Sequence, residues 1–148
     1  MPTTAPADLH LEIDERLAES GNRYTQGRRR LVELLASSGR PLTIPELLDL
    51  DKGLTQSSTY RNLDVLESCD VVRRLVHAGD HARFELAEEF SSHHHHLVCG
   101  NCGEVTDIEL SSEVELTIER ALQRAARAHG FVAERHAVDL YGLCGTCA

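Results

Sequence analysis

Apolar residues recur at helical spacing through the first half of the chain. Leu9, Ile13 and Leu17 lie four residues apart, and further stripes of leucine and valine follow as far as Cys69. Thr25 stands just before one of these stripes, where a side-chain hydroxyl can cap a helix, and a second threonine precedes the next stripe in the same way. The pattern predicts three or four short helices.

Two short strand-like runs follow between Val71 and Leu86, on either side of a Gly79-Asp80 pair that is typical of a hairpin turn. Short helices followed by a hairpin form the outline of a winged helix-turn-helix, with the hairpin as the wing. A small helical bundle with an added hairpin is the alternative that this order of elements leaves open.

The second half of the chain has a different pattern and begins after a polar junction. Strand-like runs at 93–99, 104–109 and 131–141 surround one helical run at about 112–129. We therefore expect an α+β protein with an N-terminal winged helix-turn-helix followed by a small α/β domain. The expected parts are a winged-helix domain over residues 1–86, a hinge over 87–92 and an α/β domain over 93–148.

Composition narrows the class of protein. Hydrophobic residues make up 41% of the 148 residues and charged residues 26%, which is ordinary for a globular chain. No apolar run approaches the roughly 18–20 residues of a membrane span. We see no secretory pattern at the start, so we expect a cytoplasmic protein with no membrane partner.

The formal net charge of −9 excludes DNA binding by bulk positive charge. A local basic patch is available nevertheless, because residues 21–30 contain four arginines and no acidic residue. These are Arg23, Arg28, Arg29 and Arg30. We expect the last three to contact phosphate if the chain binds DNA.

Four of the five cysteines form two Cys-x-x-Cys pairs, Cys99/Cys102 and Cys144/Cys147. Each such turn places two thiolates at the separation that tetrahedral Zn²⁺ accepts, so two turns complete a four-sulfur shell. We expect a structural zinc site, with a redox dithiol as the alternative. Cys69 is left over and is expected to be a small buried apolar residue.

Four consecutive histidines precede the first cysteine pair. If this segment is a strand, His93 and His95 face one side and the two histidines between and after them face the other. Glu119 on the predicted helix and His136 on the last predicted strand are expected to complete the first set. A shell of three imidazoles and one carboxylate suits Zn²⁺ and tolerates Fe²⁺, Mn²⁺ or Ni²⁺.

The opposite face of the same strand predicts a second site. His94 and His96 would share it with Glu85, at the end of the wing, and with Asp107. One strand would then supply histidine ligands to two different ions.

Four segments of the chain together resemble one known family. They are Ser58-Thr59-Tyr60-Arg61-Asn62-Leu63, Phe84-Glu85-Leu86, the stretch from His93 to Cys102, and Tyr141-Gly142-Leu143-Cys144. In these segments the chain resembles the ferric uptake regulator superfamily of metal-dependent bacterial repressors. The resemblance covers about residues 20–148.

The resemblance implies that residues 1–86 form a DNA-binding domain and that residues 93–148 form a small α/β dimerisation and metal-binding domain. It also implies a homodimer that binds a palindromic operator in double-stranded DNA. It implies structural zinc at the four paired cysteines, a regulatory ion at His93, His95, Glu119 and His136, and DNA contacts from the helix that starts near Ser57. With the basic patch, the expected DNA-binding residues are Arg28, Ser57, Ser58, Thr59, Tyr60 and Arg61.

The sequence therefore predicts a metal-responsive repressor rather than an enzyme. Zinc is favoured as the regulatory metal because the shell is rich in nitrogen, and iron- or manganese-responsive and peroxide-sensing members are the alternatives. His95 stands where iron-sensing members often have Asp, and Arg73 and Ala87 stand where zinc-sensing members often have Asp and Cys. A zinc-dependent hydrolase is the alternative from another class, and four protein ligands speak against it.

Overall fold

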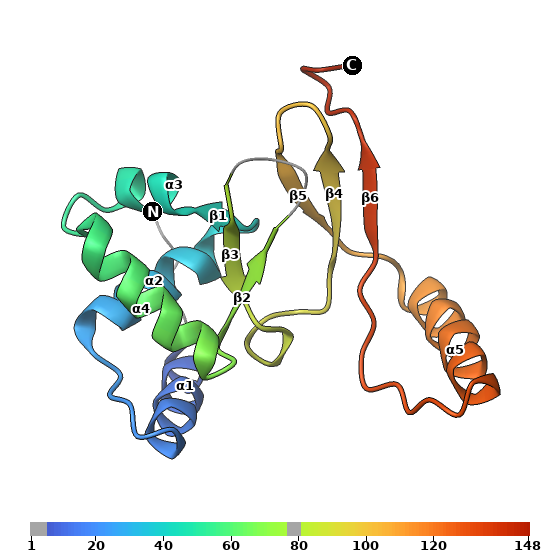
Figure 1. Cartoon of the computed structure of the whole chain (residues 1–148), viewed down its shortest axis with the longest axis horizontal. Helices are drawn as coiled ribbons and strands as arrows, with labels where there is room; N and C mark the ends of the chain where they lie inside the picture. Colours follow the sequence, from blue (N-terminus) through green and yellow to red (C-terminus); the bar gives the residue numbers. More distant parts are fainter. Residues whose placement is uncertain (1–5, 77–80) are drawn as a thin grey trace. The chain divides into compact units, whose positions relative to one another are not determined.

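The computed structural model describes residues 6–76 and 81–148, and its elements are drawn in Figure 1. The chain separates into two compact units, Met1–Ser92 and His93–Ala148. The predicted Gly79-Asp80 turn lies outside the described residues. Residues 87–92, expected as a hinge, group with the first unit and contain the short 3-10 helix η1 (Glu88–Phe90).

The first unit opens with the predicted helices. Thr25, Thr43 and Thr55 each cap a helix, because the side-chain oxygen accepts a hydrogen bond from a backbone N–H in the first turn. At Thr43 the cap is reciprocal, since Glu46 bonds back to the Thr43 backbone. The helices are α1 (Ala7–Glu19), α2 (Gln26–Ser38), α3 (Ile44–Leu50) and α4 (Gln56–Ser68).

Three strands complete this unit as an antiparallel sheet in the order β1-β3-β2. They are β1 (Leu42–Thr43), β2 (Val72–Leu75) and β3 (Arg83–Leu86). Leucine and valine side chains from the helices and Phe84 from β3 form one buried core, in which Leu17, Leu31 and Leu66 are fully buried. Cys69 is 4% exposed in the same core, as expected for a small apolar residue. The predicted winged helix-turn-helix is confirmed.

The second unit is a three-stranded sheet with one long helix (Figure 1). In the order β5-β4-β6, β4 pairs antiparallel with β5 and parallel with β6. Because β4 and β6 are parallel, the chain must return to the start of the sheet between them. Helix α5 lies in this return, between β5 and β6. The elements are β4 (His95–Cys99), β5 (Val105–Ile108), α5 (Ser112–Ala128) and β6 (Asp139–Gly142).

The last strand is shorter than the sequence predicted. We expected a strand over residues 131–141, but 131–138 adopt neither helix nor strand. The register explains the difference. Asp139 is paired with His96, the second residue of β4, and the His96 N–H donates to the Val138 carbonyl, so residues before Val138 lie beyond the start of β4. His136 therefore lies on a loop and not on a strand.

Helix α5 is amphipathic, yet none of its side chains is buried within this chain. Leu116 is 55% exposed and Leu122 is 42% exposed. On the sheet, the paired residues Leu97 and Leu140 are 40% and 51% exposed. Among the described residues, no helix has the length and apolar character that a membrane crossing requires.

Candidate metal centres and nucleic-acid interface

The four paired cysteines meet at one end of the second unit. Cys99 ends β4, Cys102 follows in the turn to β5, and Cys144 and Cys147 follow β6. Cys102 Sγ and Cys144 Sγ lie 3.8 Å apart, and the four sulfurs are within 4.8 Å of one another. A tetrahedral zinc with Zn–S bonds of about 2.3 Å needs sulfurs about 3.8 Å apart, so this arrangement fits zinc.

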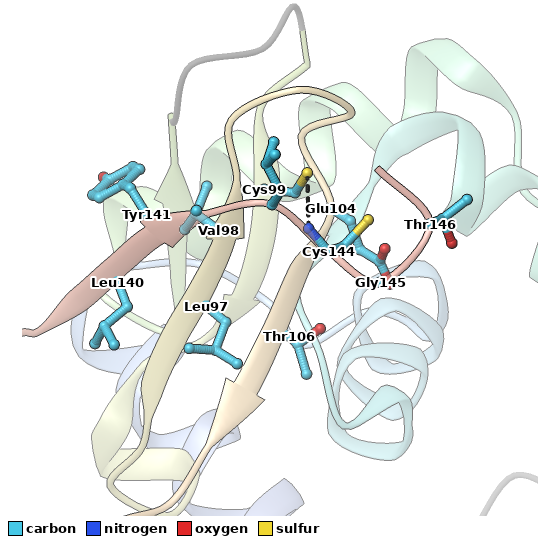
Figure 2. Close-up of a pocket in the computed structure, with 12 residues that line it drawn as sticks. Leu97, Val98, Cys99, Glu104, Thr106, Leu140, Tyr141, Cys144, Gly145 and Thr146 are labelled. Carbon is cyan, nitrogen blue, oxygen red and sulfur yellow. Dashed lines mark hydrogen bonds between the residues drawn. The ribbon is translucent and has the colours of Figure 1, made fainter. Parts of the chain in front are cut away.

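Backbone N–H groups surround these sulfurs. Figure 2 shows the hydrogen bond from the Cys144 N–H to Cys99 Sγ, which is 3.4 Å long. The backbone N–H groups of Cys102, Cys144 and Asn101 lower the pKa of Cys99 to about 6. At Cys102 an N–H of Glu104 lowers the pKa, but the adjacent Cys99 sulfur and the other thiols raise it to about 12. The pKa of the Cys144 thiol is also raised, with the neighbouring Cys147 thiol as a cause. A bound divalent cation would favour the thiolate form of these cysteines.

A second cluster of side chains forms around Glu115 on α5. Its carboxylate lies 2.7 Å from His95 Nε2 and 3.2 Å from His93 Nε2. His136 Nε2 is 3.5 Å from the same carboxylate. We call these four residues the His93 cluster: His93, His95, Glu115 and His136, with ligand atoms within 4.8 Å of one another.

The carboxylate at this position is a correction to the sequence prediction. We expected Glu119, but the structure places Glu115 among the imidazoles, one helical turn earlier. Glu119 instead accepts a hydrogen bond from His136 Nδ1 at 2.9 Å, on the side of the ring away from Nε2. Residues four apart share one face of a helix, so the pattern could not choose between them. The Ser111 cap sets where α5 begins, but the contacts of α5 with the three histidines are what select Glu115.

The His93 cluster has the donor chemistry that a divalent cation requires. His95 is 1% exposed at its side chain and His136 13%. His136 Nε2 is buried and makes no hydrogen bond within the described part of the chain, so its bonding capacity is not used by a protein group. Burial raises the pKa of Glu115, but His95 and His93 outweigh that effect and bring it below its ordinary value. Three imidazoles and a carboxylate held as an anion fit a divalent ion.

The other two histidines lie together on the side of the chain opposite His95. His96 is on β4 and His94 lies just before it, because the strand begins at His95 and not at residue 93 as predicted. His94 Nε2 is 3.9 Å from one oxygen of Asp107 and His96 Nε2 is 3.7 Å from the other. His96 Nδ1 also lies 3.1 Å from Asp139, which we had not singled out. The strand pairing of Asp139 with His96 puts both residues on one face, but that register was not readable from the sequence.

Glu85 was expected to join this second set. It belongs to the first unit, where it is buried on β3 and forms an ion pair with Arg73, its cross-strand neighbour on β2. A role for Glu85 as a metal ligand stays a prediction.

The expected DNA-reading helix, α4, presents part of the predicted set to solvent. Ser57, Tyr60 and Arg61 are exposed, with Tyr60 at 49%. Ser58 is half-buried and its hydroxyl bonds to Thr55. Thr59 is 0% exposed, so the prediction that it contacts DNA is wrong: it lies on the same helix face as the core residues Leu63 and Leu66.

The arginines of the predicted basic patch have different roles. Arg30 forms a two-pronged ion pair with Asp51, with Nε 2.7 Å from the carboxylate, so it ties α2 to the end of α3. Arg29 lies over the Tyr24 ring, with its guanidinium carbon 4.8 Å from the ring centroid. Arg28 is half-buried and donates to the Arg23 carbonyl. The expectation that Arg30 contacts phosphate is not supported, because its guanidinium is already paired.

Comparisons with known proteins agree with this combination of fold and sites. The model of the ferric uptake regulator family matches residues 19–141. The chain is 33% identical over 140 residues to the ferric uptake regulation protein of Campylobacter jejuni, covering 88% of this chain and 83% of that protein. It is 28% identical over 141 residues to the peroxide operon regulator of Bacillus subtilis, covering 93% and 92%.

A solved structure gives the same result. The ferric uptake regulator of Vibrio cholerae matches with a TM-score of 0.69 at 27% identity, over 88% of this chain and 98% of that one. A winged helix followed by clustered metal-binding side chains defines a metal-responsive transcription regulator. The chain belongs to the ferric uptake regulator family. Members of this family are regulators and not enzymes, so the hydrolase alternative is excluded.

Proposed function

We propose that this protein is a repressor whose affinity for operator DNA rises when the His93 cluster binds a divalent cation. One observation carries the proposal: three imidazoles and a carboxylate converge in a protein with a winged-helix unit. They come from β4 and the residues just before it, from α5, and from the loop before β6. The bound cation would supply a cross-link among these three segments.

The chain connectivity suggests how the cluster acts on DNA binding. Ser92 is the last residue of the winged-helix unit and His93, the next residue, is a cluster member. Fixing His93 and His95 against Glu115 would order the start of the second unit where the first unit joins it. A site that binds one arrangement of a protein better than another shifts the population towards that arrangement.

Tyr60 and Arg61 are the side chains we propose to meet base edges, because both project from the exposed face of α4. Arg28 and Ser57 would contact the phosphate backbone and so fix the position of α4 on the duplex. Such a regulator would act in the cytoplasm, where the operator DNA is.

We infer a homodimer formed through the second unit. Strand β6 lies at an edge of its sheet, so its outer side can pair with a second copy. Leu97 and Leu140 lie along an open surface beside the cysteine cluster (Figure 2), in a groove of about 610 Å³. Helix α5 adds the exposed Leu116 and Leu122. A second copy would cover these apolar surfaces, which a single chain leaves in water.

Sedimentation tests the dimer. The substitution Leu122→Glu on α5 is expected to shift the protein to monomers. A matched control, Leu50→Glu, changes a leucine that is 60% exposed in the first unit and should leave the dimer intact. A dimer unaffected by Leu122→Glu together with Leu140→Glu would contradict this surface.

Zinc at the four cysteines is proposed as structural, because four sulfurs close the shell. For the His93 cluster we propose zinc first, since three of four ligands are imidazoles, with Fe²⁺ or Mn²⁺ as the alternatives. Elemental measurement of protein purified without chelator, followed by DNA binding with each metal in turn, separates them.

The function is tested by fluorescence anisotropy on a duplex selected from a random pool. Protein that retains one zinc per chain is titrated with and without added Zn²⁺, Mn²⁺ or Fe²⁺. We expect about 10- to 100-fold tighter DNA binding with the cognate metal. The gain should vanish in Glu115→Gln and persist in Glu113→Gln, which changes an exposed glutamate in the same helical turn. Equal affinity in all conditions would contradict the proposal.

A peroxide sensor is the second candidate, favoured by the identity with the peroxide operon regulator. Protein loaded with Fe²⁺ would be treated with hydrogen peroxide and the peptide that contains His93 to His96 measured by mass spectrometry. Added oxygen in the iron-loaded protein, and none in the zinc-loaded control, would support it. An unmodified peptide in both would exclude it.

A further inference from the structure

We propose that Glu119 is a positioning residue for the His93 cluster: it holds the His136 ring through Nδ1 and leaves Nε2 to bind the cation. This inference rests on the proposal that the cluster binds a regulatory ion. It assigns Glu119 a role different from that of a ligand, and it adds Gln123 as a second member of the same chain of hydrogen bonds.

The two nitrogens of His136 have distinct surroundings. Nδ1 lies 2.9 Å from Glu119 Oε2, a hydrogen-bond distance to a carboxylate. Nε2 lies 3.5 Å from Glu115 Oε2, is buried, and has no hydrogen-bond partner in the described part of the chain. Because a carboxylate only accepts, the proton of the neutral ring belongs on Nδ1, and the lone pair of Nε2 then faces the cluster.

Glu119 is itself held in place. Gln123 Nε2 donates to Glu119 Oε1 at 2.9 Å and lies 3.4 Å from the carbonyl oxygen of Ala133. These two contacts join Glu119 to the loop that carries His136.

The hydrogen bonds of Glu119 and Gln123 hold a segment that has no regular secondary structure. Residues 131–138 form neither helix nor strand, so regular backbone pairing does not fix His136. Glu115, Glu119 and Gln123 lie four residues apart on one stripe of α5. The stripe presents one carboxylate to the cluster and uses the next two side chains to hold the loop that carries His136.

The same arrangement occurs on the other face of β4, which supports reading it as a device for orienting histidines. His96 Nδ1 lies 3.1 Å from Asp139, and His96 Nε2 is directed at Asp107 at 3.7 Å. In both clusters one carboxylate contacts Nδ1 and a different carboxylate lies on the Nε2 side. Such partners fix the ring and raise the basicity of the ligating nitrogen.

The experiment uses the full chain with its structural zinc, and Co²⁺ as the probe of the His93 cluster. Affinity is measured by competition titration for the wild type, Glu119→Ala, Glu119→Gln and the control Glu113→Gln. We expect Glu119→Ala to weaken Co²⁺ binding by about 10- to 100-fold, the usual cost of losing such a partner. Glu119→Gln should recover most of the affinity, because its amide oxygen still accepts from Nδ1.

Two further measurements separate positioning from ligation. The Co²⁺ absorption spectrum should keep its band positions in Glu119→Ala, because the four ligands are unchanged. Nitrogen NMR of the metal-free protein should show His136 with its proton on Nδ1 in the wild type and a loss of that preference in Glu119→Ala. If Glu119→Ala does not fold, the same comparison is made with Glu119→Gln, which should keep the Nδ1 proton.

Each opposite result overturns the proposal. Equal loss of affinity in Glu119→Gln and Glu119→Ala, or a Co²⁺ spectrum changed by both, would make Glu119 a ligand. An unchanged affinity and unchanged protonation of His136 in Glu119→Ala would leave Glu119 with no role, while metal-dependent DNA binding would still stand. A wild-type protein that binds no Co²⁺ at the cluster would end both this inference and the proposed function.

Discussion

His95 and His96 are adjacent in the chain, but their imidazoles lie on opposite faces of β4. His95 Nε2 is 2.7 Å from Glu115, whereas His96 Nδ1 is 3.1 Å from Asp139. The alternation of side chains along a strand therefore divides one run of histidines between two separate clusters.

This separation predicts that the two clusters can be disabled one at a time. His95→Ala should weaken cation binding at the His93 cluster by more than about 100-fold, since even partners outside the ligand set cost 10- to 100-fold. His96→Ala should leave that affinity within about threefold, as expected for residues with no shared partner. Calorimetric titration with Zn²⁺ checks both; equal losses would show one coupled site.

Removal of one sulfur ligand should release the structural zinc. In Cys102→Ser we expect zinc per chain, measured after gel filtration, to fall by one equivalent. The midpoint of thermal unfolding of the second unit should fall by on the order of 10 °C or more, because metal-binding free energy contributes to folding. The control Cys69→Ala changes the buried cysteine of the first unit and should keep the zinc. Full zinc retention in Cys102→Ser would contradict the four-sulfur site.

Glu46 gives the winged helix a stability that depends on pH. Burial raises its pKa, but the Thr43 backbone N–H and the guanidinium groups of Arg40 and Arg83 outweigh that effect, so the pKa of Glu46 lies below its ordinary value. A carboxyl group with a lowered pKa stabilises the fold above its ordinary pKa, and this contribution is lost as the pH falls through the lower folded-state value.

Glu46→Gln should therefore cost about 1 kcal/mol in urea unfolding at pH 7 and less at pH 3. Asp49→Asn, at an exposed position on the same helix, is the control and should change little. A cost that stays constant from pH 7 to pH 3 would show that charge on Glu46 contributes nothing.

Much of this account follows from local patterns. The helix caps, the apolar stripes, the paired cysteines and the alternation of His93 to His96 all depend on neighbours within a few residues, so the sequence predicts them. The choice of Glu115 over Glu119 and the pairing of Arg30 with Asp51 depend on contacts between elements far apart in the chain. Thr59 was a local error, since its spacing of four from the core residue Leu63 already indicated burial.

The burial of Thr59 leads to its own prediction. Its hydroxyl oxygen is buried and makes no hydrogen bond within residues 6–76 and 81–148, the part that the structure describes. Thr59→Val keeps the shape and removes this polar atom, so we expect unchanged or higher stability, by up to about 1 kcal/mol, and unchanged DNA affinity. Tyr60→Ala, on the exposed face of the same helix, should weaken DNA binding instead. A loss of DNA affinity in Thr59→Val would contradict this prediction and would indicate that Thr59 contacts DNA.

The most direct test of the central claim is an anomalous diffraction map from crystals of the full chain grown with Zn²⁺. The account predicts a peak bonded to nitrogens of His93, His95 and His136 and to an oxygen of Glu115, at about 2.0–2.2 Å. Glu119 should remain on His136 Nδ1. No peak among these side chains, with the four-cysteine site filled in the same crystal, would contradict it.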